Sequence, residues 1–251
     1  MTILVFIYGL IIGSFLNVCI YRIPRDESIC FPASHCPKCG LKLNWYDNIP
    51  MLSYMILKGR CRKCDNFISL QYPIVELVNG LTYVWLYLYF GFTIDFVFYS
   101  LISSVLIIIA FIDLLHMVIP DSLIFVILIL NTLQKIILFL FEKIDMNLLD
   151  SLLGLLLSGG LFLIIYILSQ GGMGDGDVTL IASLGFVLGL KKVILNILLS
   201  FFIGALISIL LLVTKVKSRK DPIPFGPFMV ISFFITLFYG SNIIIWYLNF
   251  F

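Results

Sequence analysis

Long uninterrupted apolar segments, separated by short polar breaks, dominate this chain of 251 residues. A helix needs roughly 20 apolar residues to cross the hydrocarbon layer of a bilayer. Too many segments reach that length for them to be core helices of a soluble protein. Hydrophobic residues make up 61% of the chain and charged residues only 12%, with a mean hydropathy of +1.13, far from soluble globular usage. The sequence therefore predicts an integral membrane protein.

The crossings are predicted to be helical, because strands of a membrane barrel would alternate polar and apolar residues and these runs do not. We expect an all-α bundle of about eight transmembrane helices, near residues 3–20, 73–91, 94–112, 122–141, 149–169, 177–190, 193–214 and 225–247. The segment 177–190 is the shortest. Its glycines and length also fit a tilted or partly re-entrant element.

Basic residues indicate how the chain is oriented. Lysines and arginines gather in two segments, 22–72 and 215–220. The positive-inside bias makes these segments cytoplasmic. Alternating the crossings from there places the amino terminus outside and the breaks near residues 113 and 177 inside. Lys191 and Lys192 run against this topology.

Two Cys-x-x-Cys pairs lie in the first basic segment: Cys36 with Cys39, and Cys61 with Cys64. This spacing is typical of a zinc site with four thiolate ligands. The rival interpretation is two disulfides, which a reducing cytoplasm disfavours. Four protein ligands leave no open coordination position, and an insert this small gains stability from a metal, so we predict structural zinc.

Asp113 and Asp177 each lie where a long apolar segment meets a polar break. Carboxylates at such positions are costly and therefore often functional. A water held between them would lose a proton to one carboxylate, while the other supports the developing oxyanion and protonates the leaving amine. Which aspartate is the base stays open. Gly174 and Gly176 would let the backbone approach an extended peptide, so we expect them to form an active-site loop.

Together these signals divide the chain into three parts. We expect a first transmembrane helix at 1–22, a small cytoplasmic zinc-binding segment at 23–72, and a helical bundle at 73–251 that carries the aspartates. The proline-rich segment 222–227 cannot be regular helix, and we expect it to line the active-site cavity or to be an ordinary loop. Glu76 favours a helix start electrostatically and is an equally good candidate for a functional residue.

Two other functions compete with hydrolysis. In an ion- or proton-coupled transporter with a structural zinc domain, the aspartates would be a relay. That class predicts further polar residues at mid-membrane depth and an internal repeat, and the sequence displays neither. A catalytically silent assembly protein would tolerate loss of the aspartates.

Several sequence motifs lie in order over nearly the whole chain: 9–24 (GLIIGSFLNVCIYRIP), 44–50 (NWYDNIP), 71–76 (QYPIVE), 112–121 (IDLLHMVIPD), 174–177 (GDGD) and 222–227 (PIPFGP). Together they resemble the motifs of the type IV prepilin peptidases, which are membrane aspartyl proteases of the GxGD type. One departure is Thr179, where the family commonly has lysine.

The resemblance implies a multi-pass protein of the bacterial inner membrane with its active site facing the cytoplasm. It implies cleavage of the short leader from prepilins and pseudopilins of type IV pilus and type II secretion systems, at a bond between glycine and a first mature residue that is usually Phe. It also implies methylation of the new amino terminus with S-adenosylmethionine, although no Rossmann-type glycine-rich turn appears. The partners implied are the leader and transmembrane helix of the prepilin and membrane lipid, with no nucleic acid.

Overall fold

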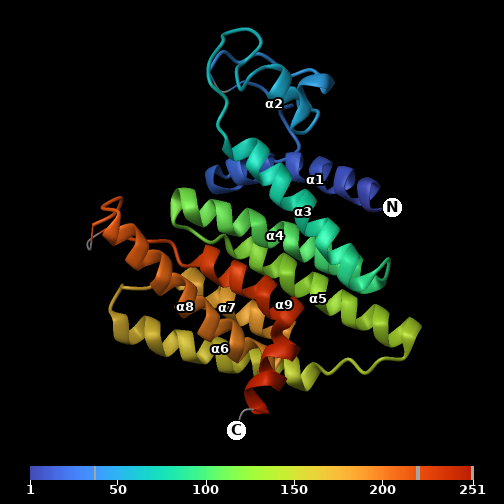
Figure 1. Ribbon diagram of the computed structural model, residues 1–251, viewed down its shortest axis with the longest axis vertical. Helices are drawn as coiled ribbons and strands as arrows, with labels where there is room; N and C mark the ends of the chain where they lie inside the picture. Colours follow the sequence, from blue (N-terminus) through green and yellow to red (C-terminus); the bar gives the residue numbers. More distant parts are fainter. Residues whose placement is uncertain (37, 219–220, 250–251) are drawn as a thin grey trace. The chain divides into compact units, whose positions relative to one another are not determined.

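The computed structural model describes residues 1–36, 38–218 and 221–249. Within these ranges the chain is helical, and its only β-type pairings are two isolated bridges. The all-α prediction is therefore confirmed. The elements are α1 (Thr2–Arg22), η1 (Ile23–Arg25), η2 (Trp45–Asn48), α2 (Leu52–Ile56), α3 (Gln71–Phe90), α4 (Ile94–His116), α5 (Asp121–Glu142), α6 (Leu148–Ser169), α7 (Asp175–Leu188), α8 (Leu190–Val213) and α9 (Gly226–Leu248) (Figure 1).

Six helices of the described chain are long and apolar enough to cross a membrane: α1 with η1, α4, α5, α6, α8 and α9. This makes the protein a multi-pass membrane protein. The predicted number of eight crossings is not confirmed, because α3 and α7 do not meet these requirements. Helix α7 has 14 residues, which span about 21 Å against a hydrocarbon layer of about 30 Å. Helix α3 is long enough, but it buries the polar side chains of Glu76 and Asn79.

The chain forms two compact units, Met1–Ile108 and Ile109–Phe251. In the first unit, α1 and α3 pack closely because glycines remove side chains from their interface. A Cβ atom on Gly9 would lie 2.8 Å from the Cα of Gly80, and one on Gly13 would lie 2.7 Å from the Cα of Glu76. The Asn79 side-chain amide donates to the carbonyl of Gly9 at 2.7 Å and ties the two helices together.

In the second unit, glycines likewise allow α6 and α7 to pack closely. A Cβ on either Gly154 or Gly185 would collide with the backbone of the other helix. Beside this contact, the Ser158 hydroxyl hydrogen-bonds the carbonyl of Ile181 at 3.0 Å. These contacts fix α7, and with it the first turn that carries Asp177, against a helix long enough to span the bilayer.

Polar side chains are also buried within the helices, which the sequence interpretation missed. They include Asn131, Gln134, Asn196, Ser200, Ser232 and Thr236. A lack of polar groups at depth is therefore not a valid argument against transport. Single asparagines and hydroxyls interrupt an apolar run too briefly to alter its mean hydropathy, so only the packing reveals that they face inward.

The proline-rich segment is irregular over residues 222–225, as predicted, and α9 begins at Gly226 with Pro227 in its first turn. Proline is tolerated there because the first N–H groups of a helix have no intrahelical acceptor. Arg219 and Lys220 of the second basic segment, and Pro37 between the first two cysteines, lie outside the described residues.

Candidate active site and metal cluster

Asp113 lies in the last turn of α4 and is only 5% exposed. Its Oδ2 accepts a hydrogen bond of 2.8 Å from the backbone N–H of Gly226, the first residue of α9. A Cβ on Gly226 would lie 2.7 Å from that same oxygen, so only glycine permits the contact. The first peptide N–H of a 23-residue helix therefore points at this carboxylate.

Asp177 lies in the first turn of α7 and is 9% exposed. The turn begins with a hydrogen bond of 3.3 Å from the N–H of Asp177 to the carbonyl of Gly174. A Cβ on Gly174 would sit 3.5 Å from Oδ2 of Asp177, at ordinary contact distance. Glycine at 174 therefore leaves open space beside the carboxylate, and the backbone does not require it.

Gly176 lets the start of α7 approach the loop that follows Asp113. A Cβ there would lie 2.7 Å from the Cβ of Ile119, so a larger residue would force the two segments apart. The approach brings Asp113 close enough to act electrostatically on Asp177. The structure thus brings together both aspartates and both predicted loop glycines in the unit Ile109–Phe251, while their catalytic role stays a prediction.

Gly226 and Ile119 are the site residues that sequence reasoning did not single out. The segment 222–227 was expected at the cavity wall, but nothing in its composition names the one amide that reaches Asp113. Asp175 is exposed at the start of α7, and its Oδ1 accepts from the N–H of the adjacent Gly176 at 2.9 Å. Thr179 donates to the carbonyl of Gly176 at 3.0 Å, which keeps its hydroxyl within its own helix.

The four predicted metal ligands come together in the first unit. The Sγ atoms of Cys36, Cys39, Cys61 and Cys64 all lie within 4.8 Å of one another. Two of the pairs are 3.9 Å apart, Cys36 with Cys64 and Cys39 with Cys61. Zn–S bonds of about 2.3 Å in a tetrahedron place sulfurs about 3.8 Å apart. The residues therefore fit a zinc ion and can hold one, and no pair is at disulfide distance.

Each cysteine pair forms the same tight turn. Cys36 donates its N–H to Leu41 and accepts from Gly40, and Cys61 donates to Asn66 and accepts from Asp65, all at 2.9–3.0 Å. Gly40 and Asp65 both have positive φ, 68° and 56°. The backbone N–H groups of Cys64 and Lys63 lower the pKa of the Cys61 thiol to about 6, whereas desolvation and the neighbouring thiols raise the pKa of the Cys64 thiol to about 11. Cys61 is therefore the thiol of this turn that most readily becomes the thiolate that a metal requires.

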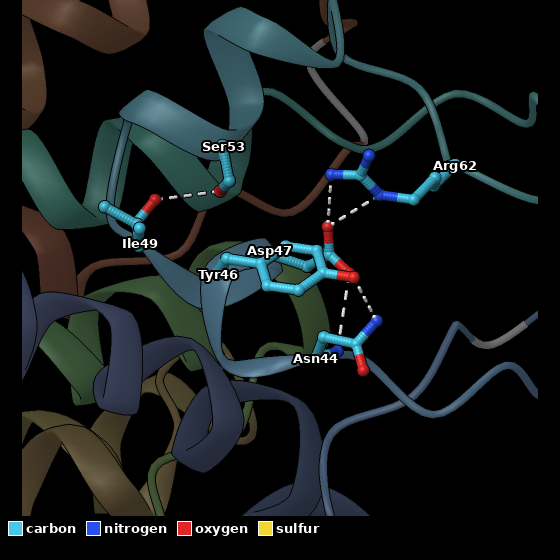
Figure 2. A network of polar contacts seen from close by, with 6 residues as sticks. All are labelled: Asn44, Tyr46, Asp47, Ile49, Ser53 and Arg62. Atoms are coloured by element: carbon cyan, nitrogen blue, oxygen red, sulfur yellow. Dashed lines mark hydrogen bonds and ion pairs between the residues drawn. The ribbon is translucent and has the colours of Figure 1, made fainter.

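The chain between the two turns is clamped to the second turn (Figure 2). Both Nε and Nη2 of Arg62 donate to Oδ1 of Asp47, at 3.0 and 2.8 Å. Asp47 in turn caps η2 by accepting from the N–H of Asn44. The arrangement holds the two cysteine turns in register without a large apolar core.

Glu76 joins the zinc-binding segment to α3. Its Oε2 accepts from the N–H of Met51 at 2.8 Å, and the Ser14 hydroxyl also hydrogen-bonds this carboxylate. Met51 has a positive φ of 57° at the start of α2. The zinc-binding segment, α1 and α3 therefore meet at one buried carboxylate, and Glu76 positions the zinc-binding segment against the two helices.

Comparison with known proteins adds independent information. Residues 7–90 match the bacterial peptidase A24 N-terminal domain, and residues 100–209 match the type IV leader peptidase family. A prepilin leader peptidase/N-methyltransferase of Legionella pneumophila is 36% identical, with 100% of this chain and 95% of the relative covered. Proteins of the same name from Bacillus subtilis and Pseudomonas aeruginosa are 34% and 32% identical, over 98% and 96% of this chain and 97% and 91% of their own lengths.

No solved structure matches the chain. The family assignment therefore rests on the sequence relatives and the two family models. The relatives align with this chain over almost its whole length, so the assignment applies to the whole chain. The chain belongs to the type IV leader peptidase family.

Proposed function

We propose that this protein is a membrane aspartyl endopeptidase that removes the leader of prepilins or pseudopilins and then methylates the new amino terminus. Family membership supports the substrate class and both activities. The single structural observation that supports the proteolytic half is the meeting of Asp113 and Asp177 at the approach of α7 to the loop after α4. Family membership does not favour the transporter alternative.

In the proposed mechanism, a water lies between the two carboxylates and attacks the carbonyl carbon of the scissile bond. One carboxylate accepts the proton from the water, and the other, protonated, donates a hydrogen bond to the developing oxyanion. Collapse of the tetrahedral intermediate breaks the C–N bond, and the leaving nitrogen takes a proton from the dyad. In this proposal the two carboxylates share one proton, so that one serves as base and the other as acid.

The substrate bond that we propose is the one between a leader glycine and a first mature residue that is usually Phe. The proposed location is the bacterial inner membrane, with the aspartates facing the cytoplasm and the prepilin transmembrane helix reaching the site through the lipid. The basic residues of 22–72 support this orientation through the positive-inside bias, with α3 counted in the proposal as a crossing between that segment and α4. A functional division into 1–22, 23–72 and 73–251 belongs to the same proposal.

The zinc-binding segment has a structural part in the proposal. Cys36, Cys39, Cys61 and Cys64 would fill all four positions of a tetrahedral zinc ion, which leaves none for a substrate or hydroxide. S-adenosylmethionine would supply the methyl group for the second activity. The proposal for methylation rests on family membership, and we derive no step for it from the geometry.

The proposed function is tested by expressing the protein with candidate prepilins in cells that lack such an enzyme, followed by mass measurement of the pilin amino terminus. Loss of the leader mass reports cleavage, and a further gain of one methyl group reports methylation. A prepilin that keeps its leader with every candidate substrate contradicts the proposed function.

A further inference from the structure

Four phenylalanine rings from three parts of the chain gather in the second unit. We call Phe162, Phe201, Phe225 and Phe228 the phenylalanine cluster. The ring centroids of Phe162, Phe201 and Phe225 form a triangle with separations of 5.8, 6.2 and 5.3 Å. Phe228 packs edge-on against Phe225 at 6.0 Å. These separations are those of favourable aromatic pairs.

The cluster is continuous with the candidate active site. Phe225 directly precedes Gly226, whose N–H holds the carboxylate of Asp113. Gly204 on α8 makes room for the cluster, because a Cβ there would lie 3.0 Å from the Phe228 ring and 3.3 Å from the Phe225 ring. The aromatic surface therefore begins at the residue directly before the N–H group that positions a predicted catalytic carboxylate.

The cluster has a buried base and an open side. Phe162 and Phe228 are buried, at 0% and 7% exposure, while Phe201 is 42% exposed and Phe225 is partly exposed. An open edge on an otherwise closed aromatic group offers ring faces to another aromatic side chain. Phe201 also projects from a helix long and apolar enough to span the bilayer, so a substrate arriving through the lipid meets this edge.

We propose that the phenylalanine cluster is the subsite for the side chain of the first mature residue of the prepilin, with Phe201 and Phe225 as the residues that determine specificity. The inference rests on the proposed function. A ring seated against Phe225 brings its own backbone nitrogen, the leaving group of the reaction, toward the carboxylates. Because lipid tails are as apolar as the subsite, the gain comes from ring packing and is modest.

The test compares cleavage of one prepilin carrying Phe, Leu or Ala as its first mature residue, with competing substrates in the same vesicles. The wild-type protein is expected to prefer Phe. Phe201→Ala is expected to lower the kcat/KM ratio of Phe over Ala substrate by roughly two- to tenfold, the range expected for one aromatic pair. Cleavage of the Ala substrate should stay within about twofold of wild type.

Phe202→Ala is the matched control, because Phe202 is the next residue of α8 and is more exposed, at 66%. It should leave the Phe-to-Ala ratio unchanged. Phe201→Leu and Phe225→Leu keep an apolar side chain but remove the ring, so they test aromatic packing where an alanine disturbs the fold. Both are expected to lower the same ratio.

An unchanged ratio in Phe201→Leu and Phe225→Leu overturns the inference, including the case where both substrates slow equally, because that result describes a structural cluster. This outcome leaves the proposed function intact, since cleavage itself still occurs. A wild-type protein that leaves every prepilin uncleaved overturns the proposed function, and the inference with it.

Discussion

At the scale of single residues, the two aspartates have different surroundings. Asp113 accepts a hydrogen bond from a fixed backbone N–H at the start of α9. Asp177 lies in the first turn of its own helix, beside the open space that Gly174 leaves. A backbone donor cannot rotate away, so it holds one carboxylate in place while leaving its second oxygen for water. The arrangement depends on glycine at 226, where no side chain fits.

Replacing either aspartate by asparagine is expected to abolish leader removal, with a loss of more than about a hundredfold, because a positioned acid or base contributes about that much or more. Asparagine has nearly the same shape, so folding and zinc content should not change. Mass measurement of the pilin amino terminus reports the outcome. Asp175→Asn is the control, since its side chain is exposed and an asparagine oxygen can still accept from the N–H of Gly176. Activity within tenfold of wild type in Asp113→Asn or Asp177→Asn would falsify the proposed dyad.

Gly226→Ala is expected to slow cleavage roughly ten- to a hundredfold, because the added Cβ displaces the Asp113 carboxylate and weakens a hydrogen bond to a charged group. The rate of leader removal in vesicles measures the effect. Gly160→Ala is a matched control, since Gly160 lies in α6 with no neighbour within 4 Å of an added Cβ. Equal rates in the two variants would remove Gly226 from the site.

At the scale of elements, short polar segments depend on local cross-links, whereas long helices depend on packing. The zinc-binding segment has two cysteine turns, a salt bridge between Arg62 and Asp47, and the contact of Met51 with Glu76. The salt bridge has a half-exposed arginine, so its net contribution to stability is small. The metal and the buried carboxylate are therefore expected to hold the segment.

Cys36→Ser is expected to lower the zinc content from close to one ion per chain to near zero and to loosen the segment, since metal binding and folding are coupled in small sites. Elemental analysis gives the zinc content, and limited proteolysis shows new cleavage within 23–70. Cys30→Ser serves as the control, because Cys30 is exposed and outside the cluster. Intact disulfides with no metal in the wild-type protein would contradict both the metal site and its cytoplasmic placement.

Glu76→Gln is expected to speed proteolysis of the zinc-binding segment several-fold, because a neutral amide oxygen binds the Met51 N–H more weakly than a carboxylate does. Zinc should remain bound, since the cysteines are untouched. Glu27→Gln provides the comparison, as Glu27 is exposed on the same segment. Unchanged proteolysis in Glu76→Gln would show that the carboxylate is not the anchor.

At the scale of the whole molecule, hydropathy and charge determine how the chain enters the membrane. Six helices of the described residues qualify as spans, and α3 and α7 do not. The loop between α4 and α5 carries few residues, so those two helices must leave the same side of the membrane. The proposed orientation counts α3 as a further crossing between the basic segment 22–72 and α4, since without it the positive-inside bias would put the break near residue 113 outside.

A cysteine at position 145, in the loop between α5 and α6, is expected to react with a membrane-impermeant thiol reagent in intact cells. Asp145 is exposed, and the proposed orientation puts this loop outside. Native Cys30 is also exposed and should react only after the cells are opened, so it serves as the internal control. Reaction of Cys30 in intact cells, with Asp145→Cys protected, would reverse the orientation.

The sequence alone determined the features that depend on nearby residues. Each apolar run carries its own transfer free energy, so helices appear at all of the predicted spans, and the all-α class is confirmed. The cysteine spacing predicted a four-thiolate cluster, because each turn needs only a few consecutive residues. The polar breaks at Asp113 and Asp177 stood out for the same reason.

Only the tertiary structure decided what depends on contacts between distant segments. The bond from Gly226 to Asp113 joins residues 113 positions apart, and no local pattern encodes it. The approach of Gly176 to Ile119 and the gathering of the phenylalanine cluster from α6, α8 and the start of α9 are of the same kind. Hydropathy measures the cost of moving one segment into lipid, whereas these contacts depend on how closely two backbones approach, and glycine sets that distance only where a partner segment meets it.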